Sequence, residues 1–419
     1  MEREHIGRSG IPVYSYTNPA QHSFFISLIL RAGSMFENES GITHFFEHVA
    51  IRNINYKMSG KLYAVLDKYG LEFNASTSNE MVQFYITGAK EHFRLGAEIL
   101  TRVLSNIELP ASEVDRERDR IRAEIREVDE ASSLAGFTAE CIWEGTTLAR
   151  PITGTLGSVR KIGVRALEEF RKATLVRENM FFYVTGNVAE CDCEYLLSLV
   201  DRYNVPSGEK NVNLAPVPNK MGQRGALVLI KNADFTKVRF NFDIDMSTCT
   251  LPELDLLYDQ LLGGYNSDFF IEMSEHRGLF YDLSGSVDRY SNVGSFSFSF
   301  ELRESKLLEA IGVTVDILRD FKENVLPRDK FITAGYIDNA MMLYDDSREL
   351  NFTFSYDNHI MECGYRDIAA RKMAYENVSP ERIREVAASI FTPLNLTLTV
   401  KGKRARLDAD AIRDVLLKL

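Results

Sequence analysis

Three residues between Ser40 and His48 (SGITHFFEH) have types and spacing that could bind and use a metal ion. If this segment is a helix with Ser40 as its N-cap, His44 and His48 lie one turn apart on one face. Their imidazole nitrogens can then each reach one zinc ion at about 2.0–2.1 Å. Glu47 borders the same face and could accept a proton from a zinc-bound water, so it is the candidate general base. The order H-x-x-E-H is the inverse of the metallopeptidase motif H-E-x-x-H.

Two histidines leave such a site one ligand short, because a catalytic zinc usually has three protein ligands and one open position. The third ligand must therefore lie on another element. The stretch from Ser112 to Glu130 is strongly helical in composition and rich in glutamate. Glu117 and Glu124 are two turns apart on one helix face, which suits a ligand supported by a second carboxylate. A solvated helix face would have the same composition, and spacing alone does not choose among Glu117, Glu124 and Glu127.

The size of the chain indicates two domains. Its 419 residues and 45% hydrophobic content suit two domains of about 200 residues each. The region from Pro206 to Gly225 is polar, contains Pro, Gly and Asn, and is typical of a linker. We therefore expect an N-terminal metal-binding domain at 1–205, a linker at 206–225 and a C-terminal domain without metal at 226–419.

The net charge and the cysteines indicate which classes of partner and which cellular compartment to expect. The net charge of −11 argues against nucleic acid as a partner, because phosphate binding needs a basic face. No apolar run approaches the roughly 18 residues that would cross a bilayer, and the N-terminus lacks the apolar core of a secretory signal. The five cysteines are odd in number and scattered, which is typical of free thiols in a reducing compartment. We therefore expect a cytoplasmic protein.

The two halves of the chain repeat one order of elements. Each has a predicted strand, then a helical stretch, then a Leu-Pro pair that opens a second helix. These elements are 82–87, about 91–106 and Leu109-Pro110 in the first half, and 295–300, about 305–324 and Leu326-Pro327 in the second. The Leu-Pro pairs are 217 residues apart (326 − 109 = 217). The pattern predicts a duplicated α+β domain with antiparallel or mixed strands. The expected strands include 23–31 and 226–231, which would begin the two sheets, and 395–400.

Further segments belong to one joint pattern. In the first half they are Ala32-Gly33-Ser34 with Glu37, Gly41-x-x-His44-x-x-Glu47-His48, Asn74-Ala75-x-Thr77 with Glu80, Glu117 with Arg120-Ile-x-x-Glu124-Ile, Gly154-Thr155, and Asn179-Met180 with Val184-x-Gly186. In the second half they are Gly263-Gly264 and Arg277-Gly278-Leu279-x-Tyr281. With these segments the chain resembles the pitrilysin-type, insulinase-like family of zinc metallopeptidases. The joint match is far more specific than H-x-x-E-H alone.

The resemblance implies a fold and a set of site residues. The fold is α+β, with two homologous halves, each a mixed or antiparallel sheet with helices packed on one face. One zinc per chain is expected in the first half. The implied residues are His44, His48 and Glu124 as metal ligands, Glu47 and Glu117 as catalytic residues with Glu117 orienting the metal shell, Tyr281 as a catalytic residue that assists at the substrate carbonyl, and Asn74 and Ala75 as substrate-binding residues.

One position departs from the family pattern. The family has an arginine seven residues before the tyrosine matched by Tyr281, and here that position is Ser274. Serine cannot supply a positively charged, bidentate donor, and Arg277 matches a different family position. The resemblance implies a dimer, and two forms stay open. One is a homodimer with altered activity or selectivity, and the other is a heterodimer with a pitrilysin-like subunit that supplies an arginine and a tyrosine.

These observations together predict an endopeptidase. It would be zinc-dependent and would cleave small unfolded peptides inside a closed chamber formed by two subunits. Maturation of a precursor peptide, for example a bacteriocin, is a narrower hypothesis of the same chemistry. The alternative is a non-catalytic structural or chaperone-like subunit of the same fold, against which the intact set of ligands and Glu47 argues.

Overall fold

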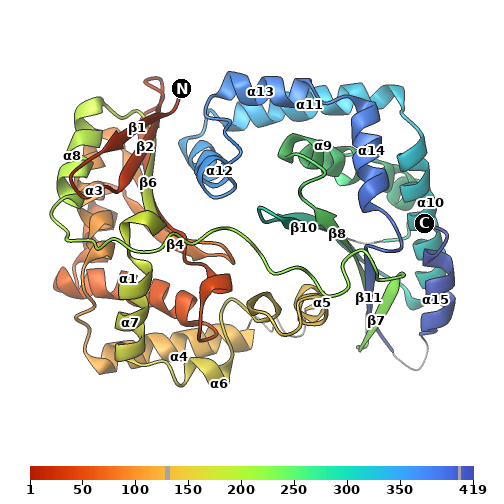
Figure 1. The fold of residues 1–419 in the computed structure, drawn as a ribbon, viewed down its shortest axis with the longest axis horizontal. Coiled ribbons are helices and arrows are strands. Elements are labelled where there is room, and N and C mark those ends of the chain that lie inside the picture. Colours follow the sequence, from red (N-terminus) through yellow and green to blue (C-terminus); the bar gives the residue numbers. More distant parts are fainter. Residues whose placement is uncertain (128–132, 281, 404–406) are drawn as a thin grey trace. The chain divides into compact units, whose positions relative to one another are not determined.

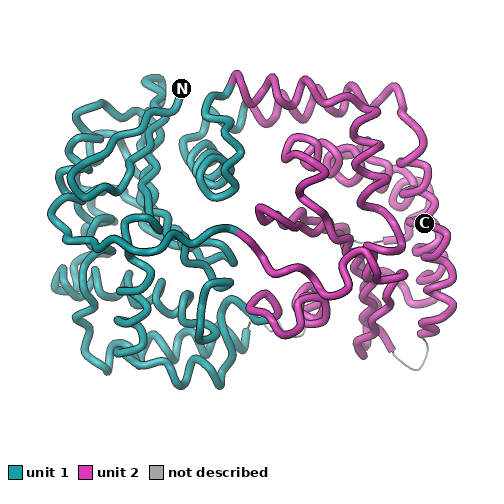
Figure 2. Tube along the Cα trace, viewed as in Figure 1, with its two compact units in different colours: residues 1–130, 150–213, 342–368 teal, residues 131–149, 214–341, 369–419 magenta. Residues whose placement is uncertain are grey.

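The computed structural model describes residues 1–127, 133–280, 282–403 and 407–419. The chain forms two compact units, drawn in different colours in Figure 2. Unit 1 comprises residues 1–130, 150–213 and 342–368, and unit 2 comprises residues 131–149, 214–341 and 369–419. The predicted domains are continuous in sequence, whereas each unit contains a segment from the other half of the chain. The boundaries at 1–205, 206–225 and 226–419 therefore stay a proposal about how the chain is organised.

Unit 1 is built on a six-stranded mixed sheet with the order β1-β2-β6-β3-β5-β4 (Figure 1). Its strands are β1 Arg3–Ile6, β2 Pro12–Thr17, β3 Ser23–Leu30, β4 Glu72–Thr77, β5 Val82–Ala89 and β6 Met180–Gly186. β2 and β6 are parallel, and the other pairs are antiparallel. The expectation that residues 23–31 begin this sheet was wrong, because β1 and β2 precede them. β4 lies at one edge, and among the described strands it is hydrogen-bonded to β5 alone.

The helices of unit 1 cover both faces of its sheet. They are α1 Ile42–Lys57, α2 Leu62–Tyr69, α3 Phe93–Leu100, α4 Ala111–Glu127, α6 Leu156–Val159, α7 Val164–Thr174, α8 Glu190–Val200 and α12 Ser347–His359. Phe24, Ile26 and Leu28 of β3 join the main apolar core, and alternation along the strand turns Phe25 and Ser27 to the opposite face. α12 covers that second face, so β3 is buried on both sides and reads as a nearly continuous apolar run.

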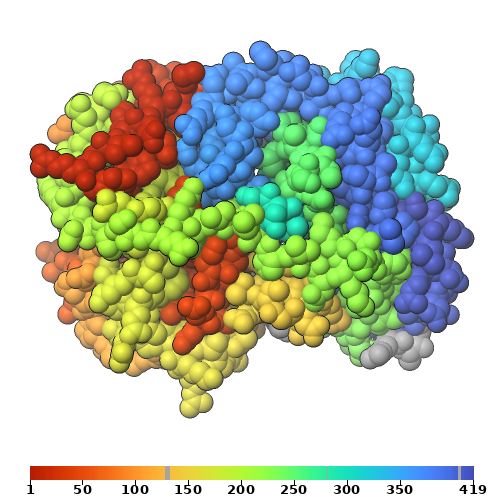
Figure 3. All heavy atoms as spheres, viewed as in Figure 1, coloured from red at the N-terminus to blue at the C-terminus, as the bar shows by residue number. Residues whose placement is uncertain are grey.

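Asn351 provides a buried polar contact between α12 and the sheet. Its side chain is fully buried. Its Nδ2 donates to the carbonyl of Tyr183 at 2.9 Å, and its Oδ1 accepts from the Ser27 hydroxyl at 2.6 Å. The same region also packs against the N-terminal strands, because the amide of Glu2 donates to the carbonyl of Arg366 at 3.0 Å. In the space-filling view the red N-terminal atoms accordingly lie against the blue atoms of residues 342–368 (Figure 3).

We expect Asn351→Ala to lower the free energy of unfolding by about 2–3 kcal/mol, because it leaves the buried Ser27 hydroxyl and the Tyr183 carbonyl without this partner. Urea denaturation followed by circular dichroism measures the effect. Glu349→Ala, on the same helix and only partly buried, is the control and should change the free energy by under about 0.5 kcal/mol. Equal effects of the two substitutions would contradict the role given to Asn351.

Unit 2 repeats the plan of unit 1 without β1. Its five-stranded sheet has the order β7-β11-β8-β10-β9, with β7 and β11 parallel and the other pairs antiparallel. The strands are β7 Leu227–Asn232, β8 Thr236–Asp245, β9 Leu283–Arg289, β10 Val293–Leu302 and β11 Leu396–Gly402. The helices are α5 Leu134–Ile142, α9 Leu251–Leu262, α10 Leu307–Glu323, α11 Pro327–Leu343, α13 Ile368–Glu376, α14 Pro380–Ile390 and α15 Ala409–Leu416.

The shared strand order establishes the duplication. β2, β6, β3, β5 and β4 of unit 1 correspond in order to β7, β11, β8, β10 and β9 of unit 2. The helices that follow the two Leu-Pro pairs, α4 and α11, begin 216 residues apart (327 − 111 = 216). The predicted fold class, α+β with two homologous halves and mixed sheets, is confirmed. Each sheet carries one helix on its second face in addition, α12 in unit 1 and α5 in unit 2, where the Thr138 hydroxyl lies 2.7 Å from that of Thr399.

Two other expectations concern the whole chain. In the described parts of the chain, no helix is long and apolar enough to cross a membrane. The predicted free state of all five cysteines is confirmed: Cys141, Cys191, Cys193, Cys249 and Cys363.

Candidate metal centre

α1 carries both histidines and Glu47. His44 and His48 are one turn apart, and their ring centroids are 4.7 Å from each other. The two imidazoles are largely buried, with 10% and 15% of their side-chain surfaces exposed. Burial and the neighbouring His48 lower the pKa of His44 to about 4. His44 is therefore neutral near pH 7, which is the form that binds a metal.

The start of α1 differs from the prediction that Ser40 is its N-cap. The cap residue is Gly41, whose φ of +86° favours glycine, and a Cβ there would lie 2.7 Å from the carbonyl oxygen of Thr153. The first amides of a helix have no acceptor within the helix. Here the buried Glu37 carboxylate accepts hydrogen bonds from Gly41 N at 2.8 Å and from Thr43 N at 3.3 Å. Glu37 thus holds the first turn of the helix, up to Thr43, which directly precedes His44. Sequence reasoning noted Glu37 but not this role.

Glu37 predicts a pH dependence of stability. Burial raises its pKa from the usual 4.5 to about 7, although the amides of Gly41 and Thr43 oppose the shift. Between these values the folded chain keeps a proton that the unfolded chain has lost. The free energy of unfolding should therefore fall by about 1–3 kcal/mol as pH rises from 4.5 to 7, and level off above. Glu37→Gln should lack this contribution, which the difference between the urea titrations of the two proteins isolates. Parallel curves would contradict the assignment.

α4 packs against α1 and brings glutamates to the histidines (Figure 1). Glu124 Oε1 lies 3.6 Å from His44 Nε2, and Glu124 Oε2 lies 3.6 Å from His48 Nε2. Glu117 approaches from the other side of His48, with its Oε2 at 3.4 Å from Nδ1. Glu127 is the last residue of α4 and is not part of the group. Sequence spacing did not choose among these three glutamates. The packing of α4 against α1 does, because each of them lies differently with respect to the histidines.

The group fits a zinc ion. One ligand atom each from His44, His48 and Glu124 lies within 4.8 Å of the others. The two nitrogen–oxygen distances of 3.6 Å are close to the separation of about 3.3 Å expected between ligands of a tetrahedral ion with bonds of about 2.0 Å. Two imidazoles and one carboxylate are also a donor set that catalytic zinc takes. The predicted cofactor, one zinc per chain, would be held by these three residues.

Glu117 contacts His48 on the ring nitrogen that faces away from Glu124, and Arg52 contacts Glu117 in turn. A hydrogen on His48 Nδ1 can be donated to Glu117, which leaves Nε2 free for a metal. Arg52 Nε lies 3.7 Å from Glu117, and its Nη2 pairs with Glu113 at 2.6 Å. Burial alone would raise the pKa of Glu117, but the hydrogen bond and charge of His48, with Arg120 and Arg52, lower it below its usual value. Arg52 was not predicted, although its position four residues after His48 was the available signal.

Glu47 stands beside the ligands but outside the group of three. It is buried, and its Oε2 accepts a hydrogen bond of 2.6 Å from the Thr77 hydroxyl on β4. Burial raises the pKa of Glu47 above its usual value and the charge of Glu124 adds to the shift, while Thr77 and His48 act in the opposite direction. A carboxylate held in this way is suited to accept a proton near neutral pH. Thr77 was seen in the sequence pattern, but its partner was not.

The remaining predicted residues lie at different places. Asn74 and Ala75 are on the edge strand β4, and Asn74 is exposed. Asn74 also lines a pocket of about 180 Å³ together with Glu47, His48, Tyr63 and Arg120. Ser274 lies in a short π-helical segment, Phe270–Glu275, of unit 2. Tyr281 lies outside the described residues.

Comparison with known families decides the classification. Residues 12–156 match the family described as insulinase, peptidase family M16, and residues 161–334 match the peptidase M16 inactive domain. The chain belongs to the M16 peptidase family. The resemblance to pitrilysin-type, insulinase-like enzymes is thereby confirmed. The residues of the candidate metal centre all lie within the first match, and the second contains none of them.

Relatives of this M16 chain carry the names of zinc proteases and of processing-peptidase subunits. An uncharacterized zinc protease of Mycobacterium tuberculosis (strain ATCC 25618 / H37Rv) is 23% identical over 393 residues, which cover 91% of this chain and 89% of that protein. The mitochondrial-processing peptidase subunit beta of Neurospora crassa is 26% identical over 315 residues, covering 72% and 64%.

Solved structures show the same fold at low sequence identity. A peptidase M16 inactive domain from Pseudomonas fluorescens superposes with a TM-score of 0.84 at 13% identity, and covers 96% of this chain and 98% of that one. A protease from Helicobacter pylori gives a TM-score of 0.82 at 15% identity, covering 96% and 99%. At these identities the likeness concerns the fold.

Proposed function

We propose that this M16 chain is a zinc-dependent endopeptidase acting on small unfolded peptides. The observation that carries the proposal is the convergence of His44, His48 and Glu124, with Glu47 held by Thr77 at the same place. A purely structural subunit has no need for a buried, hydrogen-bonded base beside three metal donors. The zinc-protease names of relatives agree with this reading.

The proposed roles follow from the geometry. A zinc ion on the three donors would polarise the scissile carbonyl and lower the pKa of a water molecule. Glu47 would take the proton of the attacking water on its carboxylate and later pass it to the leaving amine. Glu117 would hold the ring of His48, since it faces Nδ1 from the side away from Glu124. Thr77 would fix the rotamer of Glu47.

The edge strand β4 is the proposed peptide-binding element. It pairs with β5, and no other strand in the described part of the chain pairs with it, so its second edge can accept an added strand through backbone hydrogen bonds. Thr77 on this strand contacts Glu47, which places the strand beside the proposed base. Asn74 and Ala75 precede it on the same strand and would contact the peptide. Backbone hydrogen bonds depend little on the amino-acid sequence of the substrate, but they require a substrate that is extended and unfolded.

A partner subunit is part of the proposal. Ser274 cannot supply the positive donor of the family pattern, so a second pitrilysin-like subunit would provide an arginine and a tyrosine, and the two subunits would enclose the peptide. A relative in Neurospora crassa is itself named as a subunit. A homodimer, a role in maturing a precursor peptide and a cytoplasmic location stay predictions of the sequence. The alternative function is a non-catalytic subunit, which the second family match, an inactive domain, keeps open.

The test uses the purified chain alone. Metal analysis and cleavage of a quenched library of unfolded peptides are measured, together with the subunit mass in solution. One zinc with cleavage would support a peptidase and refute the need for a heterologous partner. One zinc without cleavage would support the heterodimer, provided that Ser274→Arg or a pitrilysin-like partner restores activity. A chain that binds no zinc under any of these conditions is the result that would overturn the proposal.

A further inference from the structure

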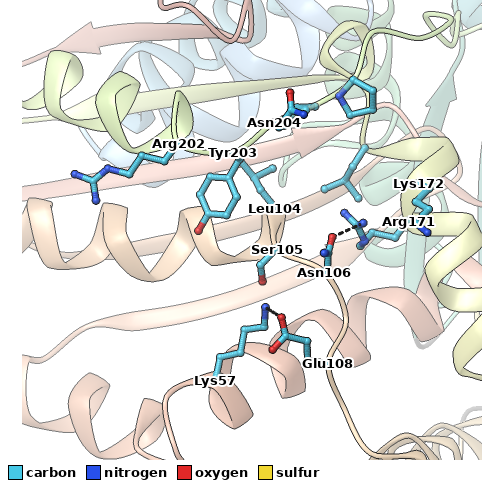
Figure 4. A pocket seen from close by; sticks show the side chains of 13 residues that line it. Lys57, Leu104, Ser105, Asn106, Glu108, Arg171, Lys172, Arg202, Tyr203 and Asn204 are labelled. Carbon is cyan, nitrogen blue, oxygen red and sulfur yellow. Dashed lines mark hydrogen bonds and ion pairs between the residues drawn. The ribbon is translucent and has the colours of Figure 1, made fainter.

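A larger pocket lies in unit 1 at the other end of α1. It has a volume of about 430 Å³, within the range of small-molecule sites. Lys57, the last residue of α1, lines it, and this residue is nine positions after His48, or about 14 Å along the helix. The lining is otherwise formed by the loop before α4, the end of α7 and the segment after α8 (Figure 4). The pocket is thus separate from the metal residues.

The charge of this pocket is opposite to that of the chain. The protein has a net charge of −11, yet the charged residues that line the pocket are Lys57, Arg171, Lys172 and Arg202 against the single acid Glu108. Figure 4 shows Arg202 directed away from the other labelled side chains, so Arg202 adds long-range attraction only. A local excess of positive charge on an acidic protein favours a negatively charged ligand.

Arg171 is the anchor of the pocket. It is 9% exposed, although it lines the cavity. Its Nε and Nη2 donate to the two oxygens of Glu168 at 2.8 Å each, and Nη2 also donates to Asn106 Oδ1 at 2.8 Å. Its Nη1 has no acceptor in the part of the chain that the structure describes. The guanidinium is therefore held rigidly, and Nη1 is the nitrogen left to donate to a ligand.

Two lysines can complete the binding of an oxyanion. Lys172 lies beside Arg171 in Figure 4, and its Nζ is 3.9 Å from Glu168, which is too far for a hydrogen bond. Lys57 Nζ pairs with Glu108 at 2.8 Å, but Glu108 is 61% exposed, so a ligand can compete with this surface pair. Both ammonium groups can turn toward an anion held at Arg171.

We infer that this pocket binds a small organic molecule through a phosphate or carboxylate group placed at Arg171 and Lys172. Such a group accepts charge-assisted hydrogen bonds from Nη1 of the guanidinium and from a neighbouring ammonium. The volume exceeds what one oxyanion needs, so the rest of the molecule would lie along Leu104, Leu175 and Val205.

The same loop connects the pocket to the helices of the candidate metal centre. Asn53 of α1 donates to the carbonyl of Asn106 at 3.0 Å and accepts from the amide of Glu108 at 2.9 Å. This loop leads into α4, which carries Glu117 and Glu124. A bound anion at Arg171 would therefore hold the loop, and through Asn53 the C-terminal part of α1. Amide hydrogen exchange of residues 53–57 and 104–111 should slow when the pocket is filled.

The test is calorimetric titration of the metal-free chain with inorganic phosphate, glycerol 3-phosphate and succinate at constant ionic strength. Metal-free protein is used because phosphate can bind a metal. We expect one saturable site, with the preference between glycerol 3-phosphate and succinate identifying the anionic group. Lys172→Glu should weaken binding by about tenfold. The control is Arg165→Glu, the same change of charge on the same helix at a residue whose side chain is 92% exposed and outside the pocket.

Arg171→Gln removes the anchor and should abolish binding in chains whose circular dichroism shows a folded state. If this variant does not fold, the inference is tested by the binding affinity of Lys172→Glu and by the amide hydrogen exchange of residues 104–111. No saturable binding of any of the three probes, or equal weakening by Lys172→Glu and Arg165→Glu, would overturn the inference.

Discussion

The Glu47→Gln variant is expected to bind one zinc per chain and to lose about 10²–10⁴-fold in the rate of peptide cleavage, measured in the assembled, active form of the enzyme. Glutamine keeps the shape of the side chain and can still accept the hydrogen bond that Thr77 donates at 2.6 Å. It cannot take up a proton at neutral pH. The loss should fall on kcat rather than on KM, because the role of Glu47 is in the transition state.

The matched control for this variant is Glu127→Gln. Glu127 is an exposed residue of α4 that lies outside the group of metal donors, and its substitution should leave cleavage within about twofold of the wild type. Retention of full activity in Glu47→Gln, with one zinc bound, would show that another residue is the base. Loss of zinc from Glu47→Gln would instead mean that Glu47 holds the metal.

Removal of one metal-donating side chain should lower the affinity for zinc strongly. Glu124 places one oxygen near each histidine, at 3.6 Å from His44 Nε2 and from His48 Nε2. We expect Glu124→Gln and His48→Ala to weaken zinc affinity by more than about 100-fold, since a substitution behind the ligands alone costs about 10–100-fold. Glu117→Gln should fall in that lower range because Glu117 contacts His48 on Nδ1.

Competition with a chelator of known zinc affinity measures these differences. Glu127→Gln is again the control, and its zinc affinity should equal that of the wild type. The sequence offered Glu117, Glu124 and Glu127 on one helix, so the three glutamine variants test the choice that the structure makes. If Glu127→Gln lost zinc while Glu124→Gln kept it, the packing of α4 against α1 described above would be wrong near the site.

Much of the fold could be predicted because it depends on local patterns. The alternation of Ser295–Phe300 has the period of a strand, and β10 indeed spans Val293–Leu302. The Leu-Pro pairs mark helix starts because proline suits the first turn, and α4 and α11 begin at Ala111 and Pro327. The place of α12 could not be predicted. Its Asn351 contacts Ser27 across 324 residues of sequence, and no local preference encodes such a pairing.

For the site, helical periodicity was enough to place His44, Glu47 and His48 on one helix face, because residues three and four apart in a helix are neighbours. The candidate metal donors that the resemblance indicates all lie in the first half of the chain. Spacing left the glutamate open and the family resemblance indicated Glu124; in the structure, the packing of α4 against α1 brings Glu124 to both histidines. The packing also shows that Glu37 rather than Ser40 accepts hydrogen bonds from the first amides of α1, and that Arg171 lines a pocket. Such contacts join residues far apart in the chain, and only packing brings them together.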